Sequence, residues 1–193
     1  MHLLSIMLLL SIVTCFLLAV CPTECTWDVF AFVLKTSPSV YRNFDWDKLT
    51  TITLVGFTDL GLIRFAHSKG VAVQYIASID KELLGNSTYR AGWVATQIAF
   101  AKDHLLDGVN LDFEEPLKSG SEGAKGYLSM IKDVTVAFHE KIPGSQVSVD
   151  VAWSPDCIDG RCYDYREIGT VADKLFGMYH TLLYARFFVA IKL

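Results

Sequence analysis

Apolar and polar residues follow two rhythms along this chain, and the rhythm changes repeatedly from one segment to the next. Short apolar runs predict strands, whereas apolar residues spaced three or four positions apart predict helices. Strands are expected at residues 29–34, 51–57, 71–77, 109–114, 146–153 and 174–179. Helices are expected at residues 60–68, 89–105 and 127–142.

The alternation of strands with helices predicts a parallel sheet with right-handed crossovers, either doubly wound or closed as a barrel. No glycine fingerprint for nucleotides follows any predicted strand, which favours the barrel. A complete (β/α)8 TIM barrel takes about 250 residues and eight strands. This chain of 193 residues offers only about six. We therefore expect an α/β fold, an incomplete TIM barrel over residues 21–193, with a divergent or incomplete end at 180–193.

The first twenty residues are the most apolar part of the chain. Residues 3–20 contain almost only apolar side chains and are followed by Cys-Pro-Thr-Glu-Cys. This position and composition predict a secretory signal peptide at residues 1–20, although His2 stands where a Lys or Arg is usual. The alternatives are a membrane anchor, because a spanning helix needs about 20 apolar residues, or a wrongly assigned start of the chain. After cleavage of the signal peptide, no stable membrane anchor is expected.

Two further features agree with the secretory route. Asn86 begins an Asn-Ser-Thr sequence, which is an acceptor for N-linked glycosylation. Cys157 and Cys162 could close a small loop by a disulfide in an oxidising compartment. The alternatives are two free thiols, or pairing with cysteines that are absent from this chain. We find no His and Cys residues at the spacing of metal ligands, and we expect neither a metal nor a cofactor.

The composition narrows the class of protein. Hydrophobic residues make up 52% of the chain and the net charge is −4, which suits one globular domain with a sizeable core. Binding to nucleic acid requires clustered Lys and Arg, so a nucleic-acid partner is not expected.

Three polar residues near the middle of the chain carry the candidate chemistry. Asn110, Asp112 and Glu114 alternate with apolar residues, so in a strand they share one face, in steps of about 6.6 Å. In a barrel this face is the interior, and catalytic residues lie at the carboxyl ends of the strands. Two close carboxylates disfavour double ionisation, so one of them keeps the proton that a glycosidase acid must donate. The alternative is an ion pair with a buried Lys or Arg, but the strand itself contains neither.

The stretch 106–114, Leu-Asp-Gly-Val-Asn-Leu-Asp-Phe-Glu, resembles the signature of glycoside hydrolase family 18. In that signature an Asp-Gly pair leads into a strand of alternating acids that ends in Glu. Asn110 is the choice typical of the di-N-acetylchitobiase branch of this chitinase-like family. The resemblance extends to segments 44–53, 66–71 and 144–155 in the same order, and covers about residues 27–178.

The resemblance implies a substrate-assisted, retaining glycosidase. Its substrates would be oligosaccharides with β-1,4 linkages between N-acetylglucosamine units, in the chitobiose core of N-glycans or in chitin. Glu114 would act as the acid and then as the base, and Asp112 would orient the acetamido group and stabilise its positive charge. Asn110 would form a hydrogen bond to Asp112 from below. The resemblance also implies residence in the lysosome, with the extracellular space as the alternative, and leaves exo and endo action open.

Other residues near the predicted strand ends are candidates for contact with the substrate. Trp153 could stack on a sugar ring or belong to the core, and Asp150 could face the barrel interior near Asp112. We take both as substrate-binding residues. Asp107 is either a turn former or functional, and His67 is expected to be structural.

One position departs from the family pattern. The sixth strand of family members ends in Met-Ser-Tyr-Asp, whereas residues 178–181 here are Met-Tyr-His-Thr. A slip of one residue along a strand turns a side chain to the other face of the sheet. The alternative function is therefore a catalytically inactive truncated isoform or a chitinase-like carbohydrate-binding protein.

Overall fold

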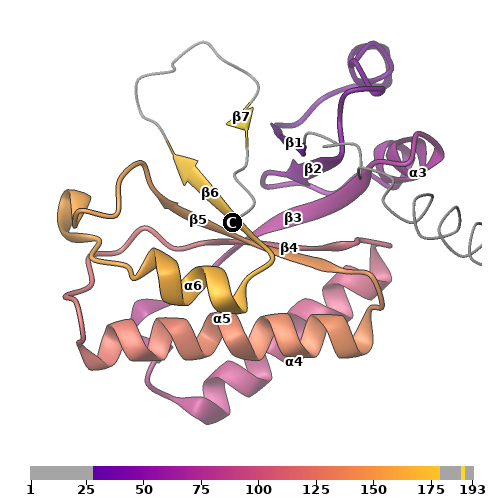
Figure 1. Ribbon diagram of the computed structural model, residues 1–193. Coiled ribbons are helices and arrows are strands. Elements are labelled where there is room, and N and C mark those ends of the chain that lie inside the picture. Colours follow the sequence, from indigo (N-terminus) through magenta and orange to yellow (C-terminus); the bar gives the residue numbers. More distant parts are fainter. Residues whose placement is uncertain (1–27, 179–187, 190–193) are drawn as a thin grey trace, which may run out of the picture.

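The strands form one sheet that runs in chain order. The computed structural model describes residues 28–178 and 188–189, and within them the sheet has the order β6-β5-β4-β3-β2-β1-β7 (Figure 1). The first six strands are parallel, and β7 (Phe188–Val189) pairs with β1 in the antiparallel direction. The parallel strands are β1 (Val29–Val33), β2 (Thr51–Leu54), β3 (Ala72–Ser78), β4 (Gly108–Asp112), β5 (Gln146–Ala152) and β6 (Lys174–Met178).

Helices connect most of the parallel strands. They are α2 (Pro38–Tyr41), α3 (Leu60–Ser68), α4 (Ser87–Asp103), α5 (Glu122–Lys141) and α6 (Tyr165–Val171), with short 3-10 turns η1 (Lys81–Leu83) and η2 (Ile158–Gly160). A doubly wound sheet reverses its strand order at a switch point, but β1 to β6 follow one another without reversal. The six parallel strands therefore form part of a (β/α)8 barrel, and the predicted incomplete barrel is confirmed.

The start of α5 was predicted too late in the chain. The helix begins at Glu122 rather than at residue 127, and the Ser121 side chain caps it by accepting a hydrogen bond of 3.2 Å from the Ala124 amide. Glycines weaken the helical pattern of this first turn. Gly126 is needed there, because a Cβ atom would lie 2.8 Å from the carbonyl oxygen of Leu84.

The end of β4 was predicted too far along the chain. The strand ends at Asp112, where its pairing with Ser78 of β3 ends, and Glu114 lies in the segment that follows. The helices α2 and α6 and the two 3-10 turns were not predicted, because their short sequences carry too few apolar repeats for a periodic pattern.

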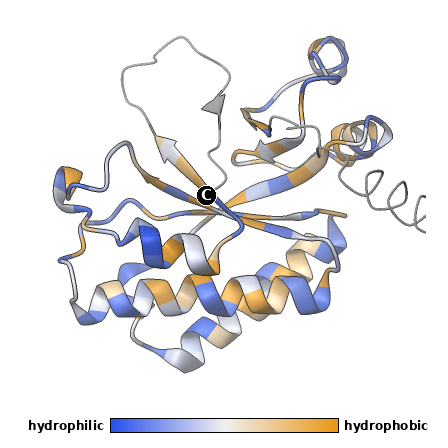
Figure 2. Cartoon of the chain, in the orientation of Figure 1, coloured by the Kyte–Doolittle hydropathy of each residue, from blue (hydrophilic) through white to orange (hydrophobic). Residues whose placement is uncertain are grey.

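The two faces of the sheet have opposite character. Apolar strand residues pack against the helices, and the tyrosine and aliphatic side chains of this layer form one large core. Figure 2 shows these hydrophobic positions alternating with hydrophilic ones along the strands, and α4 and α5 with mixed surfaces. The other face carries buried polar side chains, namely Thr51, Thr53, Gln74, Asn110, Ser148, Asp150 and Lys174. The inner face of the partial barrel is therefore polar over β2 to β5, whereas Phe30, Phe32 and Phe176 form an apolar cluster between β1 and β6.

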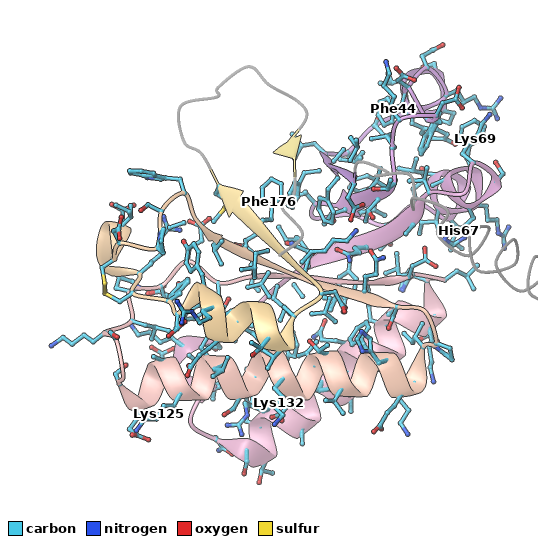
Figure 3. All side chains as sticks on the ribbon, viewed as in Figure 1. Phe44, His67, Lys69, Lys125, Lys132 and Phe176 are labelled. Carbon is cyan, nitrogen blue, oxygen red and sulfur yellow. A yellow bond between two sulfur atoms is a disulfide. The ribbon has the colours of Figure 1, made fainter. Side chains whose placement is uncertain are left out.

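The sheet curls until its first and last parallel strands face each other. The ring centroid of Phe176 on β6 lies 5.8 Å from that of Phe30 and 4.7 Å from that of Phe32, both on β1. Figure 3 shows Phe176 projecting from β6 toward β1. Lys174 Nζ lies 2.7 Å from the carboxylate of Asp28, which precedes β1, and 3.4 Å from Thr51 Oγ1 on β2. Side-chain contacts thus hold β6 against β1 and β2.

Two aspartates at the amino ends of the strands repeat one arrangement. Asp107 Oδ2 accepts a hydrogen bond from the Val73 amide of β3 and lies 2.7 Å from His67 Nε2 of α3. In the same way, Asp173 Oδ2 accepts from the β5 amide of Val147 and lies 3.0 Å from the Nε2 atom of a histidine in α5. Asp107 and His67 therefore tie strands to a helix, at the opposite end of β4 from Asp112.

Several predictions concern residues outside the described part of the chain. These are the signal peptide at residues 1–20, and Tyr179, His180 and Thr181 after the sixth strand. Among the described residues, no helix has the length and apolar composition that crossing a membrane requires.

Candidate active site

Two carboxylates lie at the carboxyl end of β4. Asp112 is the last residue of the strand and is partly buried, whereas Glu114 lies two residues further on with a side chain that is 49% exposed. Phe113 between them is buried in the core on the other side. Its ring packs 4.6 Å from that of Tyr127 on α5, which anchors this segment. Glu115 is exposed.

The surroundings of Asp112 shift its pKa upward. Burial raises the pKa of Asp112, the negative charge of Glu114 raises it further, and the cation of Arg161 opposes both effects. Asp112 is thus the more buried of two neighbouring carboxylates, and their negative charges repel each other. The more exposed of the two, Glu114, is the one that a ligand at the strand ends would meet.

A chain of hydrogen bonds lies beneath the two carboxylates. Asn110 Nδ2 donates to Ser148 Oγ and to Asp150 Oδ1, each at 2.9 Å. Ser148 Oγ donates to Gln74 Oε1 at 2.7 Å, and Gln74 Nε2 donates to the carbonyl oxygen of Gln146 at 3.0 Å. No motif in the sequence singles out Gln74 and Ser148, although both stand on the same face of the sheet as Asn110.

The expected hydrogen bond from Asn110 to Asp112 is absent from the described structure. An amide group carries two N–H bonds, and both are directed to side chains of β5. Asn110 is fully buried and Asp150 is 2% exposed, so both lie below the surface that a substrate would contact. They form the floor of the site.

Asp150 is the most strongly perturbed carboxyl group of this floor. Burial raises the pKa of Asp150 to about 8, with smaller contributions from the charges of Asp112 and Glu114, while the hydrogen bond from Asn110 acts in the opposite direction. Below that pH the side chain is neutral and adds no negative charge beneath Asp112.

Trp153 lies just beyond the carboxyl end of β5. The residue is 51% exposed, so it does not belong to the buried core. Tyr165 Oη donates to the carbonyl oxygens of Ala152 and Ser154, on either side of it, at 2.5 and 3.0 Å. This support fixes the backbone from which an exposed aromatic ring projects at the same end of the sheet as Glu114.

Arg161 is the residue of the site that the sequence did not reveal. It is 3% exposed, and its Nη1 atom lies 3.6 Å from Glu114 Oε2 while Nη2 lies 3.3 Å from Asp159 Oδ2. The absence of Lys and Arg from β4 was an argument against an ion pair there, but the loop after β5 supplies the cation. No sequence pattern relates Arg161 to β4, because the contact depends on how that loop folds.

The same loop is closed by a disulfide between Cys157 and Cys162.

Asn86, the candidate glycosylation site, is exposed and caps α4. Its Oδ1 atom accepts a hydrogen bond of 3.0 Å from the Tyr89 amide. The cap uses the side-chain oxygen and a glycan is attached to the nitrogen, so the two roles are compatible. Within the described ranges, no group of three or more His, Cys, Asp or Glu residues could hold a metal ion.

Two proteins named di-N-acetylchitobiase are similar to this chain in sequence. No family model matches the chain. Di-N-acetylchitobiase of Rattus norvegicus is 37% identical over 151 residues, which are 78% of this chain and 41% of that protein. A Bos taurus protein of the same name is 33% identical over 119 residues, which are 62% of this chain and 68% of that protein.

The chain belongs to the di-N-acetylchitobiase family. It spans 41% of the length of the rat relative. The similarity to the rat relative covers 78% of this chain and therefore extends far beyond the stretch at residues 106–114.

Solved structures similar to this di-N-acetylchitobiase-family chain include chitinase domains. The C-terminal domain of a putative chitinase from Desulfitobacterium hafniense has a TM-score of 0.64 at 15% identity and covers 82% of this chain and 56% of that domain. A mutant catalytic domain of an Ostrinia furnacalis group II chitinase, in complex with penta-N-acetylchitooctaose, has a TM-score of 0.58 at 19% identity and covers 79% of this chain and 50% of that one. These similarities establish the fold.

Proposed function

We propose that this chain carries the catalytic residues of a glycosidase that hydrolyses β-1,4 linkages between N-acetylglucosamine units. The observation that carries the proposal is the placement of Glu114, half exposed beyond β4 and next to Asp112, whose pKa is raised. Membership of the di-N-acetylchitobiase family supports the same reaction.

The proposed mechanism is substrate-assisted and requires one protein acid. Glu114 transfers its proton to the glycosidic oxygen, and the bond from that oxygen to the anomeric carbon breaks. The carbonyl oxygen of the substrate's own 2-acetamido group bonds to the anomeric carbon and forms an oxazolinium ion. Asp112 orients the acetamido group and stabilises the positive charge. Water then loses a proton to Glu114 and attacks the anomeric carbon, whose bond to the acetamido oxygen breaks. The two successive inversions leave the configuration retained.

The floor of the site supports this division of roles. Asp150 is neutral below a pH of about 8, so Asp112 has no ionised carboxylate beneath it. Asn110 is itself uncharged and holds Asp150 at 2.9 Å. The negative charge that faces the oxazolinium ion is therefore confined to the mouth of the partial barrel, where the substrate binds.

The proposed substrates are chitin oligosaccharides and the chitobiose core of N-glycans. Only sugars with a 2-acetamido group can supply the internal nucleophile. The Ostrinia furnacalis domain with the same fold is in complex with a chitin-type oligosaccharide. Trp153, half exposed at the strand ends, is positioned to stack on a sugar ring.

The test compares the protein with its Glu114→Gln and Glu115→Gln variants. Both residues are exposed and adjacent in the chain, but only Glu114 belongs to the proposed site. The Glu115→Gln variant is therefore the matched control. We expect N-acetylglucosamine release from chitobiose and chitotriose by the wild type and by Glu115→Gln, and its loss in Glu114→Gln. Equal release by all three proteins contradicts the proposal. Micromolar binding of chitotriose without release indicates a chitinase-like carbohydrate-binding protein instead. No binding and no cooperative unfolding indicates an inactive truncated isoform.

We also propose that the protein enters the secretory pathway and resides in the lysosome, with the extracellular space as the alternative. The exposed Asn86 sequon and the Cys157–Cys162 disulfide support this route, because disulfides persist in oxidising compartments. In animal cells, enzymatic removal of N-glycans should increase the electrophoretic mobility of the wild type but not of Asn86→Gln. Co-localisation with a lysosomal marker distinguishes the two destinations, and a cytosolic, unglycosylated product contradicts both.

A further inference from the structure

We infer that Arg161 is a positioning residue for Glu114, presented by the loop that the Cys157–Cys162 disulfide closes. The inference rests on the proposed role of Glu114 as acid and base. It adds a cation from the loop after β5 to a site otherwise described by the carboxylates of Asp112, at the end of β4, and of Glu114, just beyond it.

The guanidinium of Arg161 has unused hydrogen-bonding capacity beside Glu114. Its Nη1 atom lies 3.6 Å from Glu114 Oε2, and both Nη1 and Nε are buried without a hydrogen-bond partner. Buried donors that lack a partner are costly, and a charge-assisted hydrogen bond forms at about 2.7–2.9 Å. Glu114 is half exposed, so its side chain can move the remaining distance. Asp159 already contacts the third nitrogen, Nη2, at 3.3 Å.

The loop fixes Arg161 relative to the backbone of Glu114. The Leu117 amide donates to the carbonyl oxygen of Gly160, and the Cys162 amide donates to the carbonyl oxygen of Leu117, both at 3.0 Å. These two bonds pair the segment after β4 with the disulfide loop. The loop is thereby held alongside Glu114 over several residues.

Tyr163, which follows the disulfide, holds the same segment from the other side. Its hydroxyl group donates to the carbonyl oxygens of Phe113 at 2.9 Å and Glu115 at 2.8 Å, the residues that flank Glu114. Gly160 allows the close approach of the loop, because a Cβ atom there would lie 3.2 Å from Pro116 Cβ and its φ of +74° is left-handed. The backbone that carries Glu114 is therefore held beside the loop that carries Arg161.

This placement acts on the ionised form of Glu114. When Glu114 gives its proton to the glycosidic oxygen, it becomes an anion, and the adjacent guanidinium stabilises and orients that anion. The other charged groups near Arg161 are Asp159 and Asp112, and Arg161 opposes the rise of the Asp112 pKa. Tyr163 and Tyr165 also face it, but burial raises the pKa of Tyr165 to about 12 and that of Tyr163 further, so both stay neutral. The effect falls on turnover more than on substrate binding.

The first experiment follows the Nε–H resonance of Arg161 by NMR in the full chain. Glu114→Gln should shift this resonance, whereas Glu115→Gln, one residue along the same exposed segment, should leave it in place. The comparison needs no enzymatic activity and no change at the buried arginine. An unchanged Arg161 resonance in Glu114→Gln overturns the inference.

The second experiment measures hydrolysis of chitobiose by Arg161→Gln and Arg161→Lys. We expect kcat to fall at least tenfold in Arg161→Gln with KM changed less than threefold, and Arg161→Lys to recover part of kcat. Equal kcat values in a folded Arg161→Gln protein contradict the inference. If the wild type itself releases no N-acetylglucosamine, the proposed function fails, and the NMR comparison still decides whether Arg161 positions Glu114.

Discussion

Asn110 donates a hydrogen bond of 2.9 Å to the carboxyl group of Asp150 and thereby joins β4 to β5 beneath the candidate acid. Both residues are buried, and an ionised carboxylate in such a place is costly unless it is paired with a charge. Asn110 supplies a donor but no charge. The pKa of Asp150 accordingly rises to about 8.

Replacement of Asp150 by Asn should remove a pH dependence of stability. The folded protein holds the Asp150 proton up to a pH of about 8, whereas an unfolded Asp loses it near pH 4, so unfolding releases a proton between these values. Wild-type stability should therefore fall with rising pH in this window, by about 1.4 kcal/mol per pH unit at most for this one group. Asp150→Asn should flatten the curve and be the more stable protein at pH 8.

Urea denaturation at pH 5, 6.5 and 8 measures this difference. Asp103→Asn, at an exposed position near the end of α4, is the control and should keep the wild-type slope. Parallel curves for wild type and Asp150→Asn would mean that Asp150 is ionised in the folded protein throughout the window.

Gly108→Ala should be strongly destabilising. A Cβ atom at Gly108 would lie 1.9 Å from the carbonyl oxygen of Gln146, which also accepts the hydrogen bond from Gln74. Overpacking of this kind costs about 1–3 kcal/mol, and the loss of the hydrogen bond adds to it. Gly92→Ala on α4 is the control, because no atom lies within 4 Å of its Cβ position, and it should stabilise the helix by about 0.5–1 kcal/mol. Thermal unfolding of both variants decides the point, and a neutral Gly108→Ala contradicts it.

Tyr163→Phe should loosen the segment that carries Glu114. The substitution keeps the ring among its aromatic neighbours but leaves the carbonyl oxygens of Phe113 and Glu115 without their donor. The expected loss is about 1–3 kcal/mol of unfolding free energy. Tyr89→Phe, at the start of α4, should change it by less than about 0.5 kcal/mol. Equal stabilities of the two variants would show that water replaces the lost hydroxyl group at no cost.

Trp153→Ala should weaken the binding of chitotriose without unfolding the protein. The exposed ring contributes little to the core, whereas stacking on a sugar ring is worth about 0.5–1.5 kcal/mol, or roughly a two- to tenfold change in Kd. Titration calorimetry with the Glu114→Gln background avoids turnover during the measurement. Val136→Ala on α5, which removes a side chain of a residue that is 49% exposed, is the control. The same Kd in both variants would exclude Trp153 from the binding surface.

Local signals in the sequence were sufficient to predict the bounds of an element whose ends carry a capping residue and a glycine. The predicted bounds of α3 agree with the structure, because Asp59 caps its first turn through hydrogen bonds to the Gly61 and Leu62 amides and Gly70 stops it with a left-handed φ of +73°. Alternation along the strands likewise predicted that Asn110 faces the inner side of the sheet. The end of β4 was misplaced because it depends on pairing with β3.

Contacts between loops could not be predicted from local pattern. Arg161 reaches Glu114 only because the disulfide loop pairs with the segment around Leu117. The partner of Asn110 was predicted wrongly for a similar reason, since Ser148 and Asp150 on β5 compete with Asp112 for its two N–H bonds. Each of these contacts depends on residues distant in sequence, whose alignment is fixed only when the sheet is assembled.

The contact between Lys174 and Asp28 has a consequence for how the chain folds. These residues stand at opposite ends of the parallel array, so their ion pair can close only when every strand between them has docked. Such long-range contacts form late on a folding pathway, because chain entropy is lost before they can form. Removal of the charge at Lys174 should therefore accelerate unfolding and leave the refolding rate nearly unchanged. The ion pair marks the last step of assembly, at which the open sheet becomes a curved one.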